Sequence, residues 1–301
     1  MICSLDSLLT VPHCSRTIAV AVAQDTEVLS AVESARRYGL ANAILVGNES
    51  EILSIATDLG IDLKNYTIIH EPDKVAASIR AVRLVRDGQA HVLMKGLVDT
   101  GVVMKEVLSG DHGLRTGRLL SHVAVFEIPG FQRLLCVSDA AMNIAPDLEE
   151  KKQILQNSVE VAHALGVPNP IVAALCAVEK VKAKMPATQD AAALAALDFP
   201  GCQVIGPLAL DNAISQEAAL RKGITDPRAG RADILLMPDI EAGNIMYKAM
   251  VFLGQAKNAG IIIGAKAPIV LTSRADSHIS KLYSIALALQ VAANTSKETN
   301  A

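Results

Sequence analysis

The chain has 301 residues, enough for two ordinary domains or one large α/β unit. Hydrophobic residues make up 51% of it, so a sizeable core can be buried, whereas aromatic residues make up only 3% and the formal net charge is −3. The scarcity of aromatic side chains and the lack of a basic excess argue against a nucleic-acid-binding protein, so a few placed basic residues would have to hold any anionic ligand.

The first half of the sequence alternates strand and helix patterns. The helix beginning at Asp25 or Thr26 has an apolar face at Val28, Ala31, Val32 and Ala35, the spacing of an amphipathic helix. Alternation of this kind predicts βαβ units and a mainly parallel sheet. Strands are expected at 17–23, 42–47, 66–71 and 90–96, and helices at 25–40, 49–61, 73–88 and 99–108.

The middle of the sequence breaks this alternation. Two apolar runs, 122–128 and 133–139, are separated by Pro129-Gly130, which predicts an antiparallel hairpin. A helix follows, with Asp147 and Glu150 as a capping box and Gly166 at its end. Further strands are expected at 170–177, 202–208, 232–239 and 267–273.

Neither the N-terminal stretch nor the cysteines indicate export. The stretch "MICSLDSLLTVPHC" carries Asp6 and lacks the basic residues of a signal peptide, and no apolar run reaches the about 20 residues that a bilayer requires. The five cysteines are scattered without metal-ligand spacing, as is typical of reduced thiols. We expect a cytoplasmic protein with no membrane association.

Polar residues gather at four places where a strand is followed by a helix. In open parallel sheets, ligands bind beyond the carboxyl ends of the strands. Asp99, Thr100, Asp139 and Asn244 are also good helix caps, so capping accounts for any one of them alone. The third junction places Gly243-Asn244 at the start of a helix. The four junctions are "MKGLVDTG" (94–101), "CVSDAAMNIAPD" (136–147), "MPDIEAGNIMYK" (237–248) and "TSRADS" (272–277).

Arg274 is the basic residue that most clearly needs an explanation. A guanidinium just after a buried strand either pairs with a structural carboxylate or binds a phosphate. The sequence contains no Walker loop, no G-x-S-x-G motif, no H-E-x-x-H motif and no cluster of histidines with ligand spacing. Phosphate chemistry without a nucleotide loop or a metal is the interpretation that remains.

The segments 92–110, 134–167 and 232–277 closely resemble the phosphate acetyl/butyryltransferase family. The "TSRADS" form and Lys95-Gly96 resemble the butyryl branch more than the acetyl branch. The resemblance implies an isocitrate dehydrogenase-like two-domain α/β fold with mainly parallel sheets and an interdomain cleft. It also implies a discontinuous domain formed by 1–117 and 262–301, around an inserted domain at 118–261.

The resemblance further implies a reversible reaction, acyl-CoA + Pi ⇌ acyl phosphate + CoA, by direct attack without a covalent acyl-enzyme. Ser273 and Arg274 match the Ser-Arg pair that contacts the acyl phosphate. Lys105 stands where the family has an arginine, and Ser280 where the acetyl branch has its base aspartate. Asp276 either replaces that base or caps the last helix. With the polar junctions, the substrate-binding candidates are Lys95, Thr100, Lys105, Asn143, Gly243 and Asn244.

This interpretation makes the chain an acyltransferase that uses short-chain acyl-CoA, butyryl-CoA above all, and inorganic phosphate as substrates. It needs no cofactor or metal, and the protein is expected to be a homodimer or a higher homo-oligomer. The alternatives are a phosphate acetyltransferase, a metal-dependent NAD dehydrogenase of the same fold, a non-catalytic binding protein, and an enzyme that takes the acyl group from a carrier protein.

Overall fold

The computed structural model of the chain describes residues 2–11, 16–272 and 276–298 and divides into two compact units. Unit 1 consists of Met1–Ser4 and Leu119–Asn258, and unit 2 consists of Leu5–Arg118 and Ala259–Ala301. Each unit is thus assembled from segments that are far apart in the sequence. The expectation that 1–117 with 262–301 and 118–261 are the two domains stays a prediction.

Unit 2 contains a mainly parallel sheet in the order β3-β2-β1-β4-β11-β10, in which β10 runs antiparallel to β11. β4 is buried along its whole length, as strands of parallel sheets covered on both faces are. The strands are β1 (Thr17–Ala21), β2 (Asn42–Gly47), β3 (Thr67–His70), β4 (Val92–Lys95), β10 (Lys257–Ile263) and β11 (Ile269–Val270).

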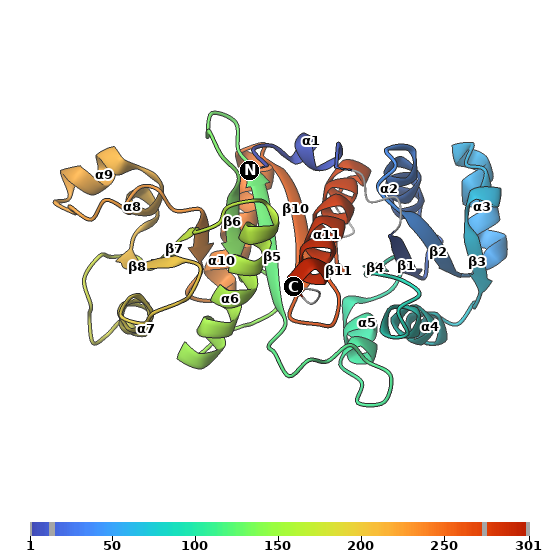
Figure 1. Cartoon of the computed structure of the whole chain (residues 1–301), viewed down its shortest axis with the longest axis horizontal. Helices are drawn as coiled ribbons and strands as arrows, with labels where there is room; N and C mark the ends of the chain where they lie inside the picture. Colours follow the sequence, from blue (N-terminus) through green and yellow to red (C-terminus); the bar gives the residue numbers. More distant parts are fainter. Residues whose placement is uncertain (1, 12–15, 273–275, 299–301) are drawn as a thin grey trace. The chain divides into compact units, whose positions relative to one another are not determined.

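Helices cover both faces of this sheet. Figure 1 shows α2 and α11 on one side of it and α4 and α5 on the other, and the helices of each pair pack against each other. Asp25 caps α2 by accepting a hydrogen bond from the Val28 backbone N–H, at 2.9 Å. The helices are α1 (Leu5–Leu8), α2 (Thr26–Arg37), α3 (Glu49–Leu59), α4 (Lys74–Arg86), α5 (Thr100–Val107), α11 (His278–Glu298) and a 3₁₀ turn, η1 (Leu63–Asn65).

Unit 1 has the strand order β5-β6-β9-β7-β8. β5 and β6 form the predicted antiparallel hairpin, and the pairs β6–β9, β9–β7 and β7–β8 are parallel. Gly130, in the turn of the hairpin, has φ +80°, a conformation that glycine adopts without steric cost. The strands are β5 (Ser121–Glu127), β6 (Leu135–Ser138), β7 (Ile171–Leu175), β8 (Gln203–Leu208) and β9 (Ile234–Leu236).

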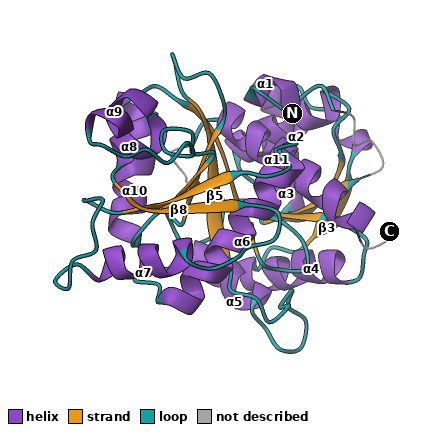
Figure 2. Cartoon of the chain, turned by 60° about the vertical axis from the view of Figure 1, so that its left-hand side comes forward, coloured by secondary structure: helices purple, strands orange, loops and turns teal. Residues whose placement is uncertain are grey.

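The helices of unit 1 also lie on both faces, and Figure 2 shows α8 and α9 on one side of β8 and α7 on the other. The predicted capping box of α6 is confirmed, with Asp147 and Glu150 each accepting from the backbone of the other. The helices are α6 (Leu148–Ala164), α7 (Pro186–Ala195), α8 (Leu210–Ile214), α9 (Gln216–Arg221), α10 (Ile240–Lys248) and a π-helical segment, η2 (Ala249–Leu253).

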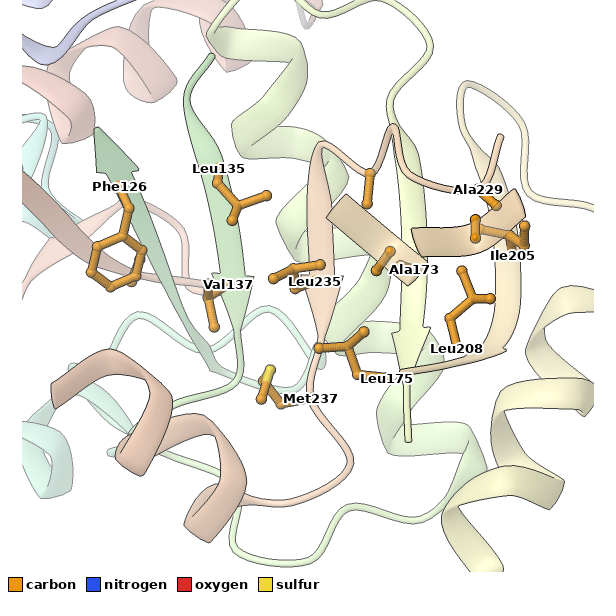
Figure 3. Close-up of a cluster of buried hydrophobic side chains, with 14 of the residues drawn as sticks. Phe126, Leu135, Val137, Ala173, Leu175, Ile205, Leu208, Ala229, Leu235 and Met237 are labelled. Atoms are coloured by element: carbon orange, nitrogen blue, oxygen red, sulfur yellow. The ribbon is translucent and has the colours of Figure 1, made fainter. Parts of the chain in front are cut away.

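The core of unit 1 shows how the sheet residues divide between its faces. Alternate residues of neighbouring strands, such as Leu135, Val137 and Leu235, lie side by side (Figure 3), and residues of α8, α9 and α10 pack against the same cluster. The intervening residues Ala174 and Leu236 line the opposite face with residues of α6 and α7. No helix in the described part of the chain is long and apolar enough to cross a membrane.

Candidate functional site

In unit 2, two of the four polar junctions lie at one edge of the sheet. β4 and β11 are parallel neighbours, with Leu93 paired to Ile269 and Met94 to Val270. The carboxyl ends of both strands therefore meet, and "MKGLVDTG" and "TSRADS" begin side by side. Ser273 and Arg274 themselves lie outside the described residues.

Lys95 ends β4 with its side chain buried at the turn that follows. Its Nζ donates hydrogen bonds to the carbonyls of Gly96 at 3.2 Å and Val98 at 3.0 Å. Gly96 lies against the end of β1, because a Cβ at this position would be 2.1 Å from the Val22 carbonyl oxygen. Only a glycine can make this approach without moving backbone, so Lys95-Gly96 sets the path of the loop into α5.

The start of α5 differs from the expectation that a side chain caps it. Asp99 occupies the cap position with an extended backbone, but its side chain makes no capping hydrogen bond. Thr100, the first helical residue, is exposed, and so is Lys105 in the last turn. Capping therefore does not account for Asp99 here, and Lys105 presents a positive charge to solvent on the helix that follows β4.

The turn before α11 assigns the cap to a residue that we did not predict. Ser277 directly precedes the helix, and its Oγ accepts from the Ser280 backbone N–H at 3.3 Å. Asp276 lies one residue earlier and is half-buried, and its carbonyl accepts from Nζ of the buried Lys281 at 2.6 Å. The capping hydrogen bond seen here thus comes from Ser277, and the assignment of Asp276 as the base or as a cap stays a prediction.

In unit 1, the other two junctions also meet at one edge, because β6 and β9 are parallel neighbours with Ser138 paired to Leu236. Asp139 is buried and organises the turn after β6. One carboxylate oxygen accepts from the backbone N–H groups of Ala141 at 2.8 Å and Met142 at 3.0 Å, and the other accepts from Nδ2 of Asn143 at 2.6 Å.

Asn143 is held on both sides, since its Nδ2 also donates to the Leu120 carbonyl at 2.9 Å. The sequence shows Asp139 only as a possible helix cap. In the structure this residue stabilises a turn and orients Asn143, so the Asp-x-x-x-Asn spacing was the available signal. Asn143 is half-buried, so it is only partly exposed to solvent.

α10 packs closely against the same turn. A Cβ on Gly243 would be 2.2 Å from the Asp139 carbonyl oxygen, and Nδ2 of Asn244 donates to the Ala140 carbonyl at 3.1 Å. The expectation that Gly243-Asn244 opens the helix is wrong. α10 begins at Ile240, because Asp239 caps it by accepting from the Ala242 backbone N–H at 2.9 Å. Gly243 and Asn244 instead form the contact between α10 and the turn.

Two cysteines of unit 1 are poorly suited to nucleophilic chemistry. Burial raises the pKa of the Cys136 thiol to about 12 and that of Cys176 to about 11. Both thiols are therefore protonated at neutral pH, and a thiolate is the nucleophilic form. No group of three or more His, Cys, Asp or Glu side chains that could hold a metal ion occurs among the residues that the structure describes.

These features define the class of protein. Mainly parallel strands carry polar turns at their carboxyl ends, in an isocitrate dehydrogenase-like α/β fold. The fold resembles the crystal structure of a branched-chain phosphotransacylase from Enterococcus faecalis V583. The TM-score is 0.83 at 37% identity, over 92% of this chain and 99% of that chain.

Sequence comparison then gives the family. The profile described as Phosphate acetyl/butaryl transferase matches residues 10–78 and 71–289. The chain is 53% identical to a phosphate butyryltransferase of Clostridium acetobutylicum over 93% of this chain and 94% of that protein. It is 48% identical to a phosphate acetyltransferase of Thermotoga maritima, over 90% and 94%. The chain belongs to the phosphate acetyl/butyryltransferase family, as the sequence motifs predicted.

Proposed function

We propose that this chain catalyses the reversible transfer of a short acyl group between coenzyme A and inorganic phosphate, with butyryl-CoA as the favoured substrate. The observation that carries the proposal is the 53% identity to a phosphate butyryltransferase across 93% of the chain. At this similarity over nearly the whole length, the same reaction class is the simplest interpretation. Coenzyme A and phosphate are substrates here, and no cofactor is required.

In the direction of acyl-CoA formation, the thiol of coenzyme A attacks the carbonyl carbon of the acyl phosphate. A base takes the thiol proton, the new C–S bond forms, and the C–O bond to phosphate breaks with release of inorganic phosphate. We assign proton removal to Asp276 and stabilisation of the charge on the carbonyl oxygen and phosphate to Ser273 and Arg274. The high pKa values of Cys136 and Cys176 support direct transfer without an acylated cysteine.

The edge of the sheet in unit 2 supports the assignment of phosphate binding. Lys95 lies at the end of β4, and Lys105 is exposed on α5. Arg274 follows β11, the strand beside β4. β4 and β11, which lead into Lys95 and into the segment that contains Arg274, thus end at the same edge of the sheet, which suits a dianionic ligand. Lysine at position 105 attracts phosphate but lacks the two-pronged geometry of arginine, so we expect a weaker grip there.

Asn143, Gly243 and Asn244 are proposed to bind substrate from unit 1. Gly243 allows the backbone of α10 to approach the Asp139 turn, and the amides of Asn143 and Asn244 are fixed by the Leu120 and Ala140 carbonyls. Rigid amides of this kind can hold the polar parts of a ligand without reorganisation. Thr100, exposed at the start of α5, completes the proposed binding residues.

The length of the acyl group distinguishes the proposed activity from its main alternative, phosphate acetyltransferase activity. The chain is 48% identical to a phosphate acetyltransferase of Thermotoga maritima. Each additional buried methylene contributes about 0.8 kcal/mol, roughly fourfold in specificity. We expect kcat/KM to rise from acetyl- through propionyl- to butyryl-CoA. The kcat/KM for isobutyryl-CoA tests whether a branched acyl chain is also a good substrate. A preference for acetyl-CoA would contradict the butyryl assignment and leave the family unchanged.

The central experiment is release of the coenzyme A thiol from butyryl-CoA by the purified chain. We expect release only when phosphate, or arsenate in its place, is present, and no effect of chelators or nucleotides. Activity that requires Mg²⁺ and NAD, with none toward acyl-CoA, would favour the dehydrogenase alternative. Hydrolysis without phosphate would contradict acyl transfer to phosphate. A cytoplasmic location and a homo-oligomeric state complete the proposal.

A further inference from the structure

Three lysines are buried in the part of the chain that the structure describes: Lys95, Lys151 and Lys281, of which 6%, 6% and 4% is exposed. Taking an ammonium group out of water is costly, so a buried lysine is typical either of a close ion pair or of a functional site. Lys151 in unit 1 is of the first kind, because its Nζ lies 2.6 Å from Oδ2 of Asp190. The surroundings of Lys281 in unit 2 favour the second.

The position of Lys281 in its helix is unfavourable for a positive charge. α11 begins at His278, so Lys281 lies in its first turn. The aligned peptide dipoles place partial positive charge at this end of a helix, where cations are destabilised. Burial and the helix dipole thus both oppose the ammonium group, and a methionine of similar length would fill the space without either cost. Packing alone therefore does not explain a lysine here.

Lys281 contacts the turn that contains Asp276. Its Nζ donates a hydrogen bond to the Asp276 carbonyl at 2.6 Å. The donor is buried, whereas Asp276 is half-buried and so is partly open to solvent. α11 packs against β4 and β11, and its first turn follows the carboxyl end of β11. The ammonium group therefore holds residue 276 from within unit 2, at the edge of the sheet proposed to bind phosphate.

We propose that Lys281 is a positioning residue, which fixes Asp276 so that its carboxylate can take the proton of the coenzyme A thiol and return it in the reverse direction. The inference rests on the proposed role of Asp276 as the base. A base acts only within hydrogen-bond distance of the proton that it removes. A displacement of about 1 Å can lower the rate on the order of 10²-fold. A charged donor limits such displacement, because its hydrogen bonds are stronger than those of a neutral donor.

Two other contacts hold the start of α11 and do not involve Lys281. Oγ of Ser277 accepts from the Ser280 backbone N–H at 3.3 Å, and the His278 backbone N–H donates to Oε2 of Glu27 on α2 at 2.7 Å. These contacts fix the helix rather than residue 276. Loss of the Lys281 ammonium group should therefore release Asp276 and leave α11 in place.

Lys281→Met separates positioning from packing. It removes the charge at similar length, so the melting temperature should stay at or above that of the wild type. The kcat with butyryl-CoA and phosphate should fall about tenfold, while KM for each substrate stays within about twofold. Lys151→Met is the matched control, because it removes a buried ammonium group that pairs with a carboxylate. It should lower the melting temperature and keep the wild-type kcat.

A double-variant cycle tests whether Lys281 acts through Asp276. Asp276→Asn should lower kcat about 10²-fold, and adding Lys281→Met should lower it no further, because no base is left to position. Independent effects would lower kcat about 10³-fold in the double variant. Lys281→Arg keeps a charged donor and should retain more activity than Lys281→Met. It takes the place of Lys281→Met in the cycle if that variant does not fold.

Three outcomes would overturn the inference and leave acyl transfer intact. They are a wild-type kcat in folded Lys281→Met, independent effects in the double variant, and a wild-type kcat in Asp276→Asn. A wild-type chain that releases no coenzyme A from butyryl-CoA in the presence of phosphate would overturn the proposed function, and the role of Lys281 with it. The assay of the wild type therefore distinguishes the two failures.

Discussion

The polar turns of the two units are built differently. In unit 1, Asp139, Asn143 and Asn244 hydrogen-bond to one another or to the backbone of the same turn. In unit 2, Lys95 binds carbonyls of its own loop, and the residues expected to meet substrate, Lys105 and Arg274, are basic. An internally bonded turn provides a rigid frame, whereas a basic edge stabilises anionic charge. Changes in unit 2 should therefore lower turnover first, and changes in unit 1 should also lower stability.

Arg274→Ala should produce the largest effect, and it tests most directly whether the basic edge of unit 2 stabilises anionic charge. Removing one donor from the developing negative charge lowers kcat by a factor of ~10²–10³, and the melting temperature should stay near that of the wild type. Arg274→Lys should recover only part of the loss, because a point charge cannot replace the forked guanidinium.

The control for this change is Arg221→Ala, which removes an exposed arginine of unit 1 whose pair with Glu217 contributes little. Its kcat with butyryl-CoA and phosphate should match the wild type. Full activity in Arg274→Ala would remove Arg274 from the site.

Asp276→Asn distinguishes a base from a structural residue. Loss of a general base should lower kcat on the order of 10²-fold with little change in melting temperature. Ser277→Ala is the matched variant, because Ser277 makes the capping hydrogen bond of α11. It should lower stability by about 1 kcal/mol and leave most activity. If Asp276→Asn keeps wild-type turnover, the base lies elsewhere.

Alanine at two buried glycines should test how closely the turns are packed. Gly243→Ala in unit 1 and Gly96→Ala in unit 2 would each place a Cβ 2.1–2.2 Å from a backbone carbonyl oxygen. Since backbone must then move, we expect a loss of ~1–3 kcal/mol in the free energy of unfolding. Urea denaturation measures it.

Gly101→Ala is the control for the glycine series. This residue lies in α5, and a Cβ there would meet nothing within 4 Å. Alanine should stabilise the helix by ~0.5–1 kcal/mol. If Gly243→Ala and Gly101→Ala have the same effect, the turn in unit 1 is not a tightly packed frame.

Glu33→Gln gives the smallest expected effect and concerns acid stability. Hydrogen bonds from Arg36, then from Tyr66 and Arg37, lower the pKa of the buried Glu33 carboxyl to about 2, against the opposing effect of burial. The stabilisation is therefore complete above its unfolded pKa of about 4.3 and is lost as the pH falls towards 2.

At pH 7, Glu33→Gln should lower the free energy of unfolding by ~1–2 kcal/mol, a value reduced for screening around the partly exposed arginines. The difference from the wild type should shrink between pH 4 and pH 2. The control, Glu217→Gln in unit 1, removes an exposed pair and should change stability by less than about 0.5 kcal/mol. Equal pH profiles for the two variants would contradict the role of Glu33.

Local sequence patterns predicted much of the architecture. The alternation of strands and helices, the β5–β6 hairpin and the capping box of α6 follow from residues close together in the chain, and all three are confirmed. β10 was not predicted, although Gly264 and Pro268, which lie between it and β11, are turn signals. The start of α10 was placed too late, because Asp239 and Asn244 are both suitable caps by residue type alone.

The sequence by itself determined the family, the reaction class and the four polar junctions, because each depends on short motifs. Only the tertiary structure decided which junctions meet. β4 lies beside β11 and β6 beside β9, although 177 and 99 residues separate their first residues along the chain. The roles of Asp139 and Ser277 were decided in the same way. A carboxylate or hydroxyl can cap a helix, stabilise a turn or bind a ligand, and the backbone N–H groups that folding brings to it determine which of these it does.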